Sequence, residues 1–178
     1  MDFSKYCQRV SALYQSQQVP FNLAAPATDA ALLAAEQQLG FTIAPSLCSA
    51  WQVADGGDSW QAIFARPNFF TGYDFLSLQQ ALAARASMQR RAPNYADYQA
   101  PEPRDPRIDI GWYQPHWLPF AAFGGGELLL IFDHKQQQII GFQHDPDAMV
   151  WVCDDFSQLL HASLTAFEQD PDEFIFPE

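Results

Sequence analysis

Basic residues are scarce in this sequence. Nine Lys and Arg residues stand against 21 Asp and Glu, which gives a formal net charge of −12 and a pI near 4.4. A negative field of this size repels the phosphate backbone of nucleic acids and anionic membrane surfaces, so neither is expected as a partner. It attracts cationic partners, although acidity also serves simply to keep a protein soluble. Both explanations of the charge remain open.

Cysteine is scarce as well. Cys7, Cys48 and Cys153 are odd in number and far apart among apolar neighbours, which predicts buried free thiols in a reducing compartment. Without a CxxC motif or a Cys/His cluster, the sequence predicts no zinc site. No apolar run approaches the ~20 residues of a membrane span, and no signal peptide is visible after Met1. We therefore expect a cytoplasmic protein.

Apolar and aromatic residues are abundant. The composition is 48% hydrophobic and 15% aromatic, and it includes 15 Phe residues. Disordered chains are poor in aromatics, so this chain is expected to bury a core that needs neither disulfides nor metal. Domains usually run to roughly 100–200 residues. The length therefore predicts one domain over residues 1–178.

Helices are predicted where apolar residues recur at helical spacing. They span residues 2–18, 29–39, 78–91 and 156–169, and a further helix begins at Pro45 and ends at the turn of residues 55–57. Thr28 or Asp29 is expected to cap the second helix and Gly40 to end it in a left-handed conformation. Residues 77–80 read as a capping box, and Asp155 as the cap of the last helix.

Strands are predicted over residues 59–64 and 69–76, around a turn at residues 66–68, and over residues 117–123, 127–133, 138–144 and 149–153. Residues 124–126 form a glycine turn, and residues 145–148 have the Asp-Pro order of a type I turn. Connections this short cannot link parallel strands. The fold class is therefore α+β, a largely antiparallel sheet of about five or six strands with helices packed on it.

Two segments have unusual composition. Residues 127–133 are almost continuously apolar, so both faces of that strand should be covered. Residues 92–110 are rich in proline and charge and read as a loop. A loop of that length is uncommon inside a domain and is usually functional or mobile.

Three motifs in their order and spacing resemble the SUKH superfamily, which contains the yeast cell-wall-assembly regulator and many bacterial immunity proteins. They are Glu36-x-x-Leu39-Gly40 with Pro45 and Trp51, the turn Ala54-Asp55-Gly56-Gly57, and the series Trp117–Phe120, Gly124–Gly126 and Glu127–Asp133. The resemblance covers residues 28–169. The helix at 2–18, Asp55 where the family has Asn, and the 92–110 segment depart from the pattern.

The resemblance implies a non-enzymatic binding scaffold. Bacterial members commonly neutralise polymorphic toxins by direct contact, and many such toxins are nucleases with basic active sites. The implied function is an immunity protein whose partner is a basic toxin domain. A housekeeping regulatory scaffold without a toxin and a hydrolase that uses clustered acids are the alternatives.

Catalytic motifs are missing. No G-x-S-x-G, H-x-x-x-H or H-E-x-x-H motif occurs, and the glycine run is followed by a strand and by Glu127, which would repel phosphate. No catalytic residue, cofactor or metal is therefore predicted. The candidate partner-binding residues are acidic side chains at turns and strand ends, with aromatics near loops: Asp55, Asp58, Trp60, Trp112, Tyr113, Glu127, Asp133, Asp145 and Asp147. For Trp112 and Tyr113, interface contact and core packing are both open.

Overall fold

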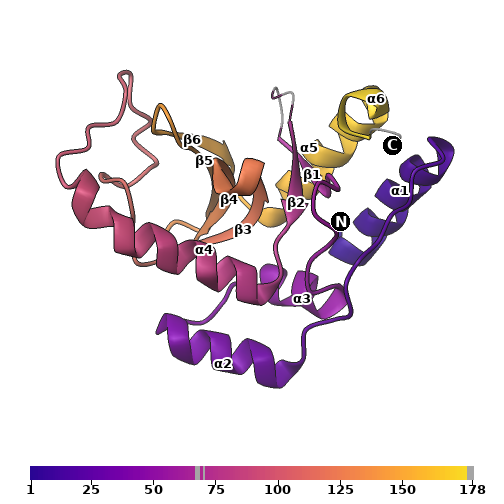
Figure 1. Ribbon diagram of the computed structural model, residues 1–178, viewed down its shortest axis with the longest axis horizontal. Helices are drawn as coiled ribbons and strands as arrows, with labels where there is room; N and C mark the ends of the chain where they lie inside the picture. Colours follow the sequence, from indigo (N-terminus) through magenta and orange to yellow (C-terminus); the bar gives the residue numbers. More distant parts are fainter. Residues whose placement is uncertain (67–68, 70, 176–178) are drawn as a thin grey trace.

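An antiparallel sheet forms the centre of the molecule (Figure 1). The computed structural model describes residues 1–66, 69 and 71–175. The strands are β1 (Phe64–Ala65), β2 (Gly72–Phe75), β3 (Trp117–Phe123), β4 (Leu128–Asp133), β5 (Gln138–Gln143) and β6 (Ala148–Cys153). They lie in sequence order, each antiparallel to its neighbour. The predicted α+β class and antiparallel sheet are confirmed.

Helices surround this sheet. They are α1 (Phe3–Ser16), α2 (Asp29–Leu39), α3 (Pro45–Val53), α4 (Leu78–Arg91), α5 (Phe156–Gln169) and α6 (Pro171–Phe174), with 3₁₀ turns η1 (Ala92–Tyr95) and η2 (Gly124–Gly126). In Figure 1, α4 runs along the lower side of the sheet and α2 lies below α4. Helix α5 packs against both β1 and α1, so the two ends of the chain meet beside the first strand.

The predicted helix signals are confirmed. The Thr28 side chain accepts a hydrogen bond from Ala31 N, and Gly40 ends α2 with φ 77°. Ser77 and Gln80 form both bonds of a capping box. Such caps satisfy backbone N–H groups that have no partner within the helix.

Core side chains fill both sides of the sheet. Leu130 and Phe132 of β4 belong to a large cluster built with α1, α2, α3 and α5. The alternating residues Leu129 and Ile131 belong to a second cluster, which includes Met88 of α4. Successive side chains of a strand point to opposite faces, so both faces of β4 are covered, as its apolar sequence predicts. Each such buried side chain contributes roughly 1.5–3 kcal/mol.

The first predicted strand is wrong over most of its length. Residues 59–63 have no strand conformation, and β1 holds only Phe64 and Ala65. The carbonyls of Ala62 and Ile63 instead accept hydrogen bonds from the Tyr14 and Tyr6 hydroxyls of α1. Among the described residues of the predicted strand 69–76, only β2 is a strand. Residue 70 and most of the predicted turn at 66–68 lie outside the described residues.

Two turns also differ from their predictions. Glu127 does not open β4, because it has helical angles (φ −64°, ψ −34°) and closes the glycine turn of η2. Gly124, Gly125 and Gly126 all have positive φ, which explains three glycines in a row. At the β5–β6 hairpin, the Asp145–Pro146 bond is cis and Asp145 has φ 54°, features absent from the simple type I turn that was predicted.

Candidate partner-binding surface

The nine candidate residues lie in separate parts of the molecule. Asp58, Trp60 and Glu127 are exposed, whereas Trp112 and Asp133 are buried. We call these three exposed residues, together with the partly buried Asp74 and Phe123 that contact Trp60, the Trp60 surface. Asp74 and Phe123 were not among the candidates, because alternation along a short strand does not show which residue faces an exposed aromatic.

Trp60 is the centre of this surface. Its side chain is 74% exposed, and its ring meets Phe123 edge to face, with 5.8 Å between ring centroids. Its backbone has φ 66°, and its N–H donates to Asp74 Oδ2 over 2.9 Å. Because Asp74 of β2 pairs with Ala122 of β3, the bond holds Trp60 over the junction of these two strands.

Three carboxylates belong to the segments next to Trp60 or in contact with it. Asp58 accepts a hydrogen bond from Asn22 Nδ2 over 2.8 Å, and Glu127 lies at the end of the turn that follows Phe123. Burial raises the pKa of the Asp74 carboxyl, and the Trp60 N–H offsets part of that rise. None of the three acids forms an ion pair with another described residue. The surface therefore carries unneutralised negative charge beside an exposed aromatic ring.

Asp55 has a structural role. Its Oδ1 accepts a hydrogen bond from Leu78 N, the first residue of α4, over 2.6 Å. It therefore ties the turn after α3 to the start of the next helix, where a carboxylate also interacts favourably with the helix dipole. A residue with this duty can border a contact surface, but it cannot be replaced without a cost to the fold.

Trp112 is part of the core. It is 2% exposed and stacks on Tyr95, with the ring centroids 4.2 Å apart and the planes 6° apart. It also meets Phe142 of β5 edge to face at 5.3 Å. Tyr113 is partly buried, and its ring centroid lies 6.0 Å from the Arg85 guanidinium carbon. Of the two possibilities that the sequence leaves open for Trp112, interface contact and core packing, the structure shows core packing.

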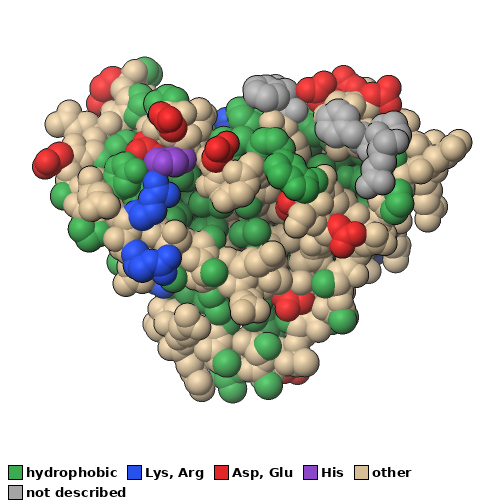
Figure 2. Space-filling model, viewed as in Figure 1, with side chains coloured by type: hydrophobic (Ala, Val, Ile, Leu, Met, Phe, Trp, Pro, Cys, Tyr) green, Lys and Arg blue, Asp and Glu red, His purple; other side chains and the backbone are tan. Residues whose placement is uncertain are grey.

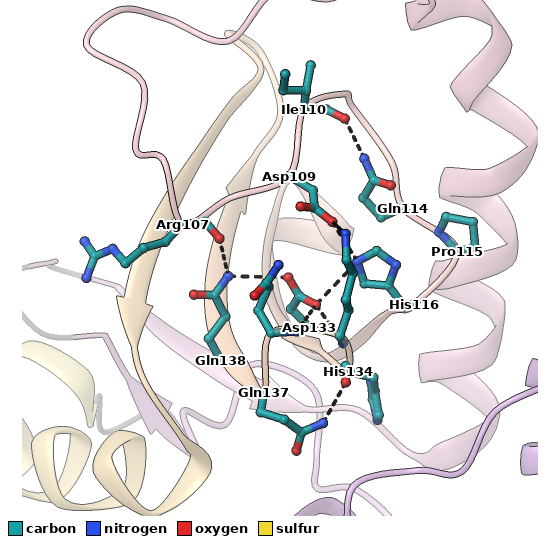
Figure 3. Close-up of polar contacts among 12 residues, drawn as sticks. Arg107, Asp109, Ile110, Gln114, Pro115, His116, Asp133, His134, Gln137 and Gln138 are labelled. Carbon is teal, nitrogen blue, oxygen red and sulfur yellow. Dashed lines mark hydrogen bonds and ion pairs between the residues drawn. The ribbon is translucent and has the colours of Figure 1, made fainter.

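Asp133 is fully buried and lies in a polar network at the end of β4 (Figure 3). Its Oδ1 accepts the backbone N–H groups of Lys135 and Gln136, each over 3.0 Å. His116 Nε2 lies 3.4 Å from this oxygen and 3.3 Å from Asp109 Oδ2. The prediction that Asp133 contacts a partner is therefore wrong, because its buried carboxylate closes the β4–β5 turn.

The same network anchors the segment of residues 96–116 to the sheet. Lys135 Nζ donates to Asp109 Oδ2 over 2.8 Å, and this hydrogen bond lowers the pKa of the Asp109 carboxyl. Gln138 Nε2 donates to Arg107 O over 2.7 Å (Figure 3). A stretch that the sequence marks as a loop thus covers the second face of the sheet.

His134 lies beside this network between Phe41 and Phe132, with ring centroids 4.7 and 4.8 Å away. Its Nε2 accepts a hydrogen bond from Ala44 N over 3.1 Å. A proton on Nε2 would oppose that donor. Burial lowers the pKa of His134 to about 4, so the ring is neutral at physiological pH.

Asp147 is bound within the β5–β6 turn. His144 Nδ1 lies 2.6 Å from Asp147 Oδ1, and His144 Nε2 lies 2.8 Å from Arg91 Nη2. A guanidinium only donates hydrogen bonds, so Nε2 must accept and Nδ1 must carry the proton given to Asp147. Asp145 is exposed in the same turn.

A cavity that the candidate residues do not line opens between residues 98–111 and β6. Its volume is about 700 Å³, and its apolar walls include Ile108, Ile110, Met149, Val150 and Trp151. Cavities of this size commonly hold ligands. The proline-rich composition of 92–110 is the sequence signal nearest to it.

Charge is unevenly distributed over the molecule. On the face in Figure 2, Asp and Glu side chains spread over the upper half, and most visible Lys and Arg atoms gather at the left. Two of the basic residues, Arg90 and Arg91, lie in the last turn of α4. Among the described residues, no group of three or more His, Cys, Asp or Glu is placed to hold a metal ion. No helix within that part of the chain is both long and apolar enough to cross a membrane.

The antiparallel meander, its helical cover and an exposed aromatic and acidic surface define an α+β domain suited to surface contact. Residues 26–162 match the SMI1 / KNR4 family (SUKH-1), and the chain belongs to this family. The match runs from just before α2 into α5 and leaves α1 outside. Membership is consistent with an immunity-type or regulatory domain, and the family is generally not a catalytic one. A search among curated proteins finds no match.

Proposed function

We propose that this protein is an immunity protein that neutralises a toxin domain with a basic surface by direct contact. The observation that carries the proposal is the excess of unneutralised carboxylates. In the described part of the chain, ion pairs with Lys or Arg involve only Asp2, Asp105, Asp109 and Glu168. Family membership supports a protein partner, and free cysteines support action in the reducing cytoplasm.

Electrostatics makes this surface suitable for such a partner. A basic toxin would be drawn to the acidic face and would associate faster than a neutral protein at low salt. The same field repels nucleic acid, so the inhibitor would cover a nuclease site without binding the substrate itself. We propose no catalysis, because each carboxylate of the buried network has a partner that accounts for its position.

The experiment is co-expression with the product of the adjacent gene. We expect the chain to restore growth to cells that produce that protein and to co-purify with it as a complex. Association should slow several-fold between 50 and 500 mM salt, roughly as for other steered complexes. The proposal would be contradicted if co-expression did not restore growth and the two purified proteins formed no complex.

A regulatory scaffold is the second candidate, and family membership favours it equally. It would use the same acidic surface on an endogenous basic protein. An isolated gene, with no neighbour that is toxic when expressed alone, would support this candidate over the first.

A further inference from the structure

Trp60 combines two features that do not serve the stability of the fold. An indole ring that is 74% exposed leaves most of its apolar area in water. A φ of 66° is a left-handed conformation that non-glycine residues seldom adopt. Strained residues persist only where the surroundings fix them, and they gather at functional positions. Contact with a partner would explain both the exposed ring and the left-handed backbone of Trp60.

The surroundings do fix Trp60. Its N–H is bound to Asp74, and its ring rests against Phe123. The following residues are held from the other side, because the Tyr14 hydroxyl donates to Ala62 O over 2.9 Å. The ring is therefore presented before any partner arrives, which reduces the entropy lost on binding.

The charges of the Trp60 surface select the partner group. The carboxylates of Asp58, Asp74 and Glu127 have no ion pair among the described residues. Asp58 and Glu127 are exposed, whereas Asp74 is partly buried beneath the Trp60 backbone. A cation over an indole face is attracted by the ring, and nearby carboxylates add to that attraction.

We propose that the Trp60 surface binds an arginine side chain of a basic protein partner. The guanidinium lies over the indole ring, and Asp58 and Glu127 accept its N–H groups. Arginine fits better than lysine, because its planar group stacks on aromatic rings and donates to a carboxylate through two N–H groups at once. The inference rests on the proposed function only in taking the partner to be a basic protein.

The first test needs no partner. The peptide acetyl-Gly-Arg-Gly-Arg-Gly-amide is titrated into ¹⁵N-labelled protein at low salt, and the indole N–H signal of Trp60 is followed. We expect saturable shifts at Trp60, Asp58 and Glu127. The same peptide with citrulline in place of arginine, which has nearly the same shape without the charge, should bind at least threefold more weakly. Equal shifts with both peptides, or shifts only at other residues, would overturn the inference.

The decisive variant is Trp60→Gly. Glycine accepts a positive φ, so this change should leave the thermal midpoint unchanged or raised while it removes the ring. We expect peptide binding to fall at least threefold, and the D58N/E127Q double variant to do the same with the ring in place. Leu33→Ala and D97N, which alter an exposed apolar and an exposed acidic residue elsewhere, are the matched controls and should bind normally.

The second test uses the toxin pair from the co-expression experiment. If the wild type protects cells and Trp60→Gly protects equally well at the same protein level, the inference fails while the proposed function stands. If the peptide binds at Trp60 but no neighbouring toxin is neutralised, the proposed function fails while the arginine site stands.

Discussion

Ser163 of α5 is the residue whose replacement most directly tests how the fold holds its first strand. It is fully buried, and its Oγ accepts the backbone N–H of Ala65 over 2.7 Å. It also lies 2.6 Å from the Tyr6 hydroxyl, which lies 2.5 Å from Ile63 O. Tyr6 has one hydroxyl proton and gives it to that carbonyl, so Ser163 must donate to the Tyr6 oxygen.

Every donor in this chain of hydrogen bonds has an acceptor, so the loss of one member leaves a buried polar group without a partner. Burial raises the pKa of Tyr6 well above its usual value, so the hydroxyl keeps its proton across the working pH range. Ser163→Ala leaves the buried Ala65 N–H without an acceptor, which costs about 1–3 kcal/mol. We expect a loss near 2 kcal/mol, or a thermal midpoint lower by roughly 4–8 °C for a chain of this length.

Urea unfolding and calorimetry measure this loss. Thr165→Ala is the matched control on the same helix, because its hydroxyl bonds the exposed His161 O, and it should change stability by less than about 0.5 kcal/mol. Tyr6→Phe should also destabilise the fold, and the double variant should lose less than the two single losses combined, because the groups share one network. A Ser163→Ala protein as stable as the Thr165→Ala control would refute the reasoning.

Three further predictions follow, two from burial and one from a hydrogen bond at the start of a helix. The pKa of His134 in the folded protein, about 4, lies below its ordinary value of 6.5, so the unfolded chain takes up the proton more readily between these values; stability should fall by about 3 kcal/mol as pH drops from 6.5 to 4. Urea unfolding of His134→Gln at both pH values should show that part of the fall removed. Burial raises the pKa of Cys7 and of Cys153 to about 12, so a thiol reagent at pH 8 should label only the half-buried Cys48, slowly, until the protein is unfolded. Asp55→Ala should cost about 1–2 kcal/mol in urea unfolding, because it removes the acceptor at the start of α4.

The helices could be predicted from the sequence because their signals are local. Ser77 and Gln80 are three residues apart, and Gly40 directly follows the helix that it ends. The pairing of each strand from β3 to β6 with the next could also be predicted, because turns this short can join only antiparallel neighbours. Strand β1 was not accessible, because the carbonyls of residues 62 and 63 are claimed by tyrosines 48 and 57 residues earlier in the chain.

The candidate site was predicted in part for the same reason. Trp60 follows an Asp-Gly-Gly turn, and turns lie at the surface, so its exposure could be expected. Trp112 also follows a glycine, yet it is buried, because residues 96–116 fold back over the sheet and stack it on Tyr95. Asp133 closes a turn, but the same segment covers it with His116 and Asp109. Neither the packing of Trp112 on Tyr95 nor the covering of Asp133 can be predicted from the spacing of residues along the chain.

Helix α1 supports the segment that follows Trp60. It lies outside residues 26–162, the part of the chain that matches the family. Its tyrosines nevertheless hold the carbonyls of Ala62 and Ile63, which directly follow the segment that presents Trp60. The residues that match the family thus supply the sheet and the acidic turns, while α1 holds the backbone that follows the segment carrying the exposed ring.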